Sequence, residues 1–263
     1  LFRTLIAAGD LEGLQRYGHA AVEAIHRNHT ALNLPMVTIA LVQGDALGGG
    51  FECALAHDVI IAEKSAKFGL PEVLFNLFPG MGAYSFLSRR LGRAAAEKMI
   101  LSGRIYTADE LHGMGLVHTV VPDGEGEQAV KDYVDANGRW HNAHHATYKA
   151  GRRVDPVTLD ELRDVVDGWA EAALRLSETD LRRMARLAAA HPGGHARGVV
   201  VAQHPRGGCT DRVVGLEGLR DDRAQRTRLP VGLEEVEVEG LVHLVLTDVA
   251  GQALGVQIGR AHV

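Results

Sequence analysis

The chain has 263 residues, of which 46% are hydrophobic and 23% are charged, and its formal net charge is −5 at pH 7. A chain of this length can bury one large core or two modest ones. Its slightly acidic balance gives no electrostatic reason to expect binding to nucleic acid or to an anionic membrane. The longest apolar stretch, Leu34–Val42, is too short to span a bilayer. Two cysteines, Cys53 and Cys209, are too few for a disulfide framework, so we expect a cytoplasmic protein.

Helical and strand patterns alternate in the first half of the chain, which favours an α/β architecture. Leu1–Leu32 is predicted to be helical with an interruption at Gly9–Asp10, because its apolar residues recur on one face. Met36–Val42 is a continuous apolar run, typical of a strand that is covered on both faces. The next elements are expected in the order helix, strand, strand, helix and helix, at Phe51–Ala56, Asp58–Ala62, Ala66–Gly69, Tyr84–Leu91 and Arg93–Leu101.

A helix start is marked by Thr107 and Glu110, which have the spacing of a capping box. We expect the helix that follows to end at Gly113 or Gly115, because glycine favours helix termination. The run Leu116–Val121 then predicts a further strand before a proline stops it.

The C-terminal part divides into a helical region and a tail of different composition. Leu159–Ala190 has apolar residues at helical spacing, with a break at Ser177–Asp180, whereas the polar stretch Tyr133–Pro156 predicts no definite element. Residues 193–263 contain no aromatic residue and no lysine, and such a segment builds a poor core. We therefore expect this tail to be non-native or disordered. The alternative is a flexible natural extension with a weak hairpin at Val236–Val249.

The most informative motif is a triple glycine followed by two spaced glutamates. Gly48–Gly50 follows the predicted strand. Glu52 comes two residues after Gly50, and Glu72 comes twenty residues after Glu52. A glycine-rich turn from strand to helix leaves backbone N–H groups unpaired, where they can stabilise a developing oxyanion. Two carboxylates that converge on such a hole can move protons on the carbon atoms beside the carbonyl group it binds. The motif predicts a site for thioester-enolate chemistry.

Each of these residues also has an ordinary structural explanation. Gly49 lies in a segment that would equally form a tight packing turn. Glu52 would complement the dipole of the helix that it begins. Glu72 follows a proline in a loop and would serve as a solvated surface acid. Their occurrence together with the loop Pro79–Gly82 in one compact stretch favours the catalytic interpretation.

This stretch resembles the crotonase (enoyl-CoA hydratase/isomerase) superfamily. Val42–Glu52 is similar to its oxyanion-hole segment, and Lys67–Glu72 with Phe78–Gly82 is similar to its second catalytic segment. Leu101–Pro122 resembles a later stretch of the family. The resemblance implies an α/β fold: a crotonase-like spiral of β-β-α turns over residues 1–130, followed by a helical region at 131–192 and the doubtful tail at 193–263.

The resemblance also implies a role for each matching residue. Gly49 would donate the second hydrogen bond of the oxyanion hole, and Glu52 and Glu72 would form the catalytic acid/base pair. The residues expected to bind substrate, or alternatively to be simple core residues, are Phe75, Leu77, Phe78, Gly80, Met81 and Tyr84. No cofactor is expected beyond an acyl-CoA or acyl-carrier-protein thioester as substrate. A homotrimer or hexamer is implied, without a nucleic-acid or membrane partner.

Within the superfamily, three details resemble the diffusible signal factor synthases: Asp45, the string Glu72–Phe86, and a long helix around Trp169. This closer resemblance implies an enzyme that dehydrates a 3-hydroxyacyl-carrier thioester to a 2-enoyl product, hydrolyses the thioester, and contacts a sensor kinase. The alternatives are a generic enoyl-CoA hydratase or isomerase and a non-catalytic crotonase-fold binding module.

The family's first oxyanion donor precedes the segment that matches Leu1–Phe2. We therefore expect a chain truncated at its N-terminus to be weakly active or inactive. His141, His144 and His145 have a spacing that mimics zinc ligands, but no nearby acidic or cysteine ligand completes a site, so no metal is expected. The glycines from Gly80 onward do not match a dinucleotide fingerprint.

Overall fold

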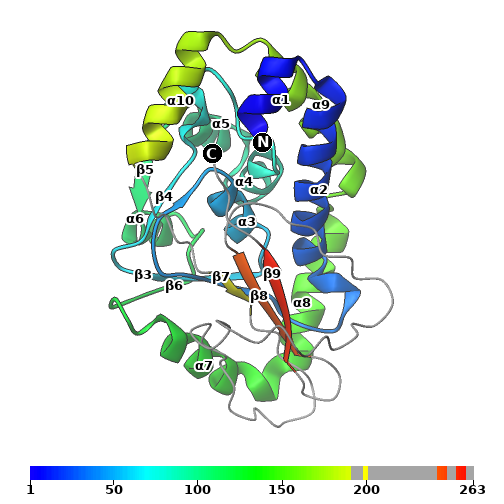
Figure 1. Cartoon of the computed structure of the whole chain (residues 1–263). Coiled ribbons are helices and arrows are strands. Elements are labelled where there is room, and N and C mark those ends of the chain that lie inside the picture. Colours follow the sequence, from blue (N-terminus) through cyan, green and yellow to red (C-terminus); the bar gives the residue numbers. More distant parts are fainter. Residues whose placement is uncertain (191–197, 201–241, 248–252, 259–263) are drawn as a thin grey trace, which may run out of the picture.

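The computed structural model describes residues 1–190, 198–200, 242–247 and 253–258. Two small sheets lie at its centre with helices around them (Figure 1). The first sheet has the order β1-β3-β6 and is parallel, with β1 at Ile39–Val42, β3 at Val59–Glu63 and β6 at Thr119–Val121. The second has the order β2-β4-β5, in which β2 (Ala46–Leu47) is parallel to β4 (Lys67–Gly69) and β4 is antiparallel to β5 (Ile105–Thr107).

Strands β1 and β3 of the first sheet are buried on both faces, as the continuous apolar runs predict, whereas β6 is partly buried. Ala40, Val42 and Ile60 belong to the main core, whereas Ile39 and Leu41 face a separate cluster. Successive side chains of a strand point to opposite faces, so both faces of β1 need a cover. Helix α7 (Gly126–Asn137) supplies part of the second cluster through buried valines.

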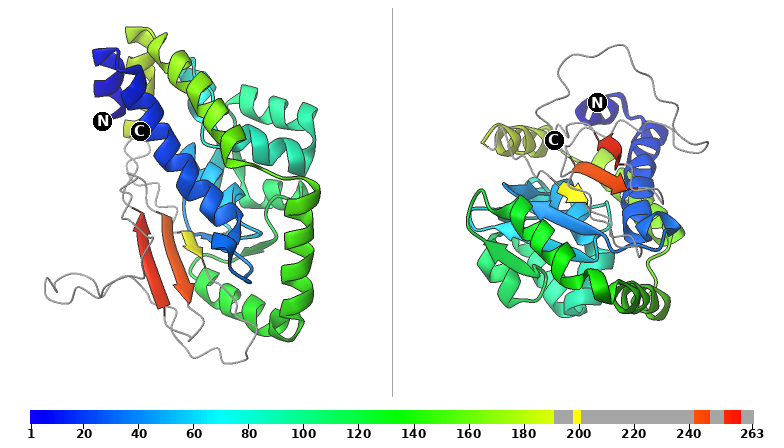
Figure 2. Two further views of the ribbon diagram at one scale, coloured as in Figure 1. Left: turned by 90° about the vertical axis from the view of Figure 1, so that its right-hand side faces the viewer. Right: turned by 90° about the horizontal axis from the view of Figure 1, so that it is seen from below.

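The helices gather at the two ends and along one side of the sheets. Figure 1 shows α1 (Phe2–Ala8), α9 (Leu159–Leu174) and α10 (Glu178–Ala190) at the upper end and α7 at the lower end. Helix α2 (Leu11–His29) runs beside α9, as both views in Figure 2 agree. The other helices are α3 (Gly49–Leu55), α4 (Ala83–Leu91), α5 (Arg93–Ser102), α6 (Ala108–Gly113) and α8 (His141–Val154), with short 3-10 helices η1 (Ala31–Asn33), η2 (Pro71–Phe75) and η3 (Gly138–Trp140).

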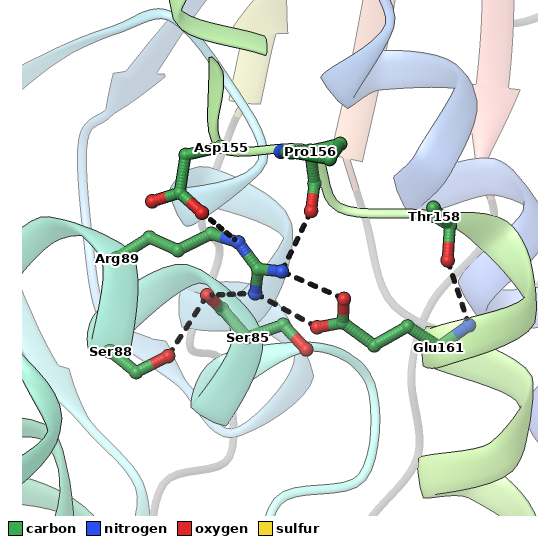
Figure 3. A network of polar contacts seen from close by, with 7 residues as sticks. All are labelled: Ser85, Ser88, Arg89, Asp155, Pro156, Thr158 and Glu161. Atoms are coloured by element: carbon green, nitrogen blue, oxygen red, sulfur yellow. Dashed lines mark hydrogen bonds and ion pairs between the residues drawn. The ribbon is translucent and has the colours of Figure 1, made fainter. Parts of the chain in front are cut away.

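Helix α9 is fixed against α4 by one arginine (Figure 3). The guanidinium of Arg89 donates two hydrogen bonds of 2.8 Å to the carboxylate of Glu161, one of 3.1 Å to Asp155 and one of 2.7 Å to the carbonyl of Pro156. A bidentate arginine–carboxylate pair is directional as well as strong. The network therefore sets the position of α9, which packs over the loop before α4.

Most sequence predictions of elements are confirmed, with changed bounds. The break at Gly9–Asp10 separates α1 from α2, and Thr107 and Glu110 form the predicted capping box at the start of α6. Strand β1 starts three residues later than predicted, because the N–H of Thr38 bonds to the Asp58 carboxylate instead of a neighbouring strand. Strand β6 starts later too, since the N–H groups of Leu116 and Val117 bond back to the Leu111 carbonyl of α6.

The stretch without a predicted element contains the end of α7, η3 and α8. Most of segment 193–263, including part of the hairpin predicted at Val236–Val249, lies outside the described residues. The structure places β7 (Gly198–Val200), β8 (Val242–Thr247) and β9 (Ala253–Ile258) in a third sheet of order β7-β8-β9. Among the described residues, no helix has the length and apolar content needed to cross a membrane.

Candidate active site

A strained glycine turn opens the site. Gly48 adopts φ 54° and ψ −125°, a conformation that only glycine takes readily, and its N–H bonds to the Gly69 carbonyl at 2.9 Å. Helix α3 starts at Gly49, two residues before the helix predicted at Phe51–Ala56. The first N–H groups of a helix have no acceptor within it, and none is found for the Gly49 N–H in the part of the chain that the structure describes. This amide is therefore available to a ligand oxygen.

Glu52 lies in the first turn of α3 and is buried, with 2% of the residue exposed. Its Oε1 accepts hydrogen bonds from the backbone N–H groups of Met81 at 2.7 Å and Ala83 at 3.0 Å. Met81 lies in the loop before α4, and Ala83 is the first residue of α4. The start of α4 therefore fixes one carboxylate oxygen of Glu52. The sequence carries no signal for this contact, because the donors are backbone groups 29 and 31 residues away.

Glu72 lies in η2 and approaches the same glycine turn. A Cβ atom built on Gly48 would be 2.6 Å from Glu72 Oε1, so a side chain at this position would displace the Glu72 carboxyl group. Part of the residue is accessible, but its Oε2 atom is enclosed and has no hydrogen-bond partner among the described residues. The alternative of a solvated surface acid is therefore wrong, because packing against the turn shields the carboxyl group.

The two carboxyl groups influence each other. Desolvation raises the pKa of Glu52 to about 7, although the two backbone hydrogen bonds act in the opposite direction. Desolvation, followed by the charge of Glu52, raises the pKa of Glu72 to about 8. An interacting pair titrates as a unit. Near neutral pH the pair therefore holds both a proton to donate and a site to accept one, which acid/base catalysis requires.

The residues predicted to bind substrate have different surroundings. The sulfur of Met81 is 3.7 Å from a Cβ built on Gly49, which places this side chain beside the free amide. Phe75 and Leu77 are buried in a different core cluster, which also contains Trp169, and Phe78 packs against that cluster. Tyr84 is 36% exposed and donates a hydrogen bond of 2.8 Å to Glu97. Their contact with a substrate stays a prediction.

Gly80 is pressed against Trp169 of α9. A Cβ atom built on Gly80 would be 2.4 Å from the indole ring. Trp169 is 6% exposed and stacks on Phe2 with a centroid separation of 5.1 Å. Its periodic spacing in the sequence marks it as a core residue of a helix, but not as a neighbour of the site loop.

The histidine cluster on α8 has a structural role. His141 Nε2 lies 3.0 Å from the carbonyl of Pro35, and its ring stacks on that of His145. No group of three or more potential metal ligands is found among the described residues.

Comparison with known proteins identifies the class. The family model for enoyl-CoA hydratase/isomerase matches residues 7–154. Mevalonyl-coenzyme A hydratase of Beauveria bassiana is 48% identical over 131 residues, which cover 50% of this chain and 42% of that protein. The 2,3-dehydroadipyl-CoA hydratase of Escherichia coli is 46% identical over 92 residues, covering 35% of each. The crystal structure of an enoyl-CoA hydratase from Bacillus halodurans matches with a TM-score of 0.55 and 26% identity, covering 66% of this chain and 74% of that chain.

The chain belongs to the enoyl-CoA hydratase/isomerase family and has its crotonase-like α/β fold with a helical C-terminal region. It spans less than half the length of these two curated relatives. The predicted superfamily is confirmed, whereas the closer resemblance to signal factor synthases stays a prediction.

Proposed function

We propose that the site catalyses the reversible addition of water to a 2-enoyl-CoA thioester. The observation that carries this proposal is the pair of enclosed carboxyl groups of Glu52 and Glu72, held beside a glycine turn with a free amide at Gly49. The two curated relatives are named as hydratases of CoA thioesters, which also supports the proposal.

In the proposed reaction the two glutamates each transfer one proton. One glutamate, ionised, takes a proton from water while the water oxygen bonds to C3 of the enoyl thioester. The electron pair of the double bond moves onto the thioester oxygen, and the N–H of Gly49 stabilises the resulting enolate. The other glutamate, protonated, then donates its proton to C2. Loss of one such N–H donor typically costs about 10²–10³ in rate.

The test is a hydratase assay that follows loss of the conjugated enoyl thioester. We expect Glu52→Gln and Glu72→Gln each to reduce kcat by about 10²–10⁴, because each removes one acid or base. Glu12→Gln is the matched control, since its side chain is 85% exposed on α2. Equal turnover by all four proteins would refute the catalytic roles and favour a non-catalytic binding module.

A finer proposal is that the protein dehydrates a 3-hydroxyacyl thioester on CoA or acyl carrier protein and releases the free acid, as the signal factor synthases do. The features that favour it are Asp45, the Glu72–Phe86 string and the packing of Trp169 on Gly80. Mass analysis of the products separates the two reactions: a free cis-2-enoic acid supports the finer proposal, and a hydrated acyl-CoA contradicts it.

The family resemblance adds proposals about the working enzyme. It acts in the cytoplasm as a homotrimer or hexamer and contacts a sensor kinase. Light scattering tests the oligomeric state, and co-purification tests the contact with the kinase.

A further inference from the structure

The segment that carries Glu72 is held from the side of α10 by one carboxylate. Helix α10 packs against η2. Asp180, 7% exposed, accepts hydrogen bonds from the N–H of Ser177 at 3.0 Å and from its hydroxyl at 2.7 Å. The same oxygen, Oδ2, accepts a longer hydrogen bond of 3.5 Å from the side-chain amide of Asn76. Asp180 in the first turn of α10, whose own N–H bonds to the Ser177 hydroxyl, therefore also binds the residue that follows η2.

Asn76 closes the turn that contains Glu72. It adopts a left-handed conformation with φ 64°, which is uncommon for a residue other than glycine. Its N–H bonds to the carbonyl of Val73 at 3.1 Å, and the N–H of Leu77 bonds to the carbonyl of Glu72 at 3.0 Å. A shift of Asn76 would therefore be transmitted to the backbone of Glu72.

Apolar contacts support the same link. Phe75 and Leu77, the neighbours of Asn76, belong to one buried cluster with Met184 of α10. Met184 is fully buried. Among the described residues, the charged group that faces Asp180 is Arg183, whose Nη1 is 3.9 Å from Oδ1 and whose side chain is 59% exposed. The contact with Asn76 is thus the connection from Asp180 toward the active site.

We propose that Asp180 is a positioning residue, which through Asn76 keeps the carboxyl group of Glu72 against Gly48. This inference rests on the proposed function, since it concerns the geometry of the same acid/base pair. A catalytic group that is displaced by about 1 Å loses about 10²-fold in rate. A partial loosening of η2 is expected to cost less than that.

Three variants test the proposal. Asn76→Gly keeps the left-handed backbone but removes the side-chain amide, and Asp180→Ala removes its acceptor. Thr158→Ala is the matched control, because Thr158 caps α9 through the N–H of Glu161 and forms no hydrogen bond to η2 in the described part of the chain. For each protein we would measure kcat and KM, the midpoint of urea unfolding, and the titration of glutamate carboxyl groups by 13C NMR.

We expect Asn76→Gly and Asp180→Ala to lower kcat by about 10-fold with KM changed less than about 2-fold, because positioning affects the reacting groups. The Glu72 carboxyl should then titrate closer to its ordinary range, while Thr158→Ala lowers only the unfolding midpoint. Wild-type kcat and titration in Asn76→Gly would overturn the proposal, as would equal kcat losses in Thr158→Ala. The titration needs no turnover, so it decides this inference even if the hydratase assay fails.

Discussion

Replacing Glu72 by glutamine is predicted to remove a pH dependence of stability that the enclosed carboxyl group creates. The pKa of Glu72 is raised from 4.5 to about 8. Between these values the folded protein keeps a proton that the unfolded chain releases, so the free energy of unfolding falls as pH rises. It falls by about 1.4 kcal/mol per pH unit for one proton, and the loss is complete above the folded pKa.

The useful pH window lies above the titration of the buried histidines. Desolvation lowers the pKa values of His29, His57 and His118 to about 4, so their contribution to stability rises with pH up to the ordinary value of 6.5. From pH 6.5 to pH 8 the Glu72 contribution alone falls by about 2 kcal/mol, because 1.5 pH units each cost about 1.4 kcal/mol. Glutamine does not titrate, so position 72 contributes no such fall in the free energy of unfolding in the Glu72→Gln variant.

The assay is urea unfolding followed by tryptophan fluorescence, since Trp169 is buried in the native state. We expect the stability of Glu72→Gln relative to wild type to increase by about 2 kcal/mol between pH 6.5 and pH 8. The control Glu12→Gln, with its carboxylate in solvent, should follow the wild-type curve. Parallel curves for Glu72→Gln and wild type would show that Glu72 ionises normally, and the assignment of an enclosed carboxyl pair would fail.

Three further predictions follow from the contacts of the site and its support. Gly48→Ala should lower kcat by about 10²-fold, because the added Cβ would displace the Glu72 carboxylate. The control Gly49→Ala should lower kcat less, since its Cβ meets only Met81, at van der Waals distance. A lower kcat for Gly49→Ala than for Gly48→Ala would contradict this reasoning. Glu52→Ala should lower the free energy of unfolding by about 1–3 kcal/mol more than Glu52→Gln does, because it leaves two backbone donors unpaired, and equal urea midpoints would exclude that reason. Arg89→Met should cost about 1–2 kcal/mol in the same assay, since it leaves Glu161 without its bidentate partner, and an unchanged midpoint would show that the network is replaceable.

Local patterns in the sequence were sufficient for several parts of the protein. The apolar run before the triple glycine predicted a strand covered on both faces, because a parallel strand between two layers needs no polar face. The capping box at Thr107 and a short helix directly after the glycine turn were predictable, since both depend on residues within one turn. The stretch from the end of α7 to α8 was not, because its polar surface hides the helical period.

The sequence by itself determined which residues are candidates for the chemistry: a triple glycine between a predicted strand and a predicted helix, and two glutamates twenty residues apart. Only the tertiary structure decided that both carboxyl groups are desolvated, which raises the pKa of each. It likewise decided that Glu52 is fixed by backbone groups at the start of α4, and that Asn76 meets Asp180 from a helix 104 residues later. Burial and mutual distance depend on how separate segments pack, and no local pattern encodes them.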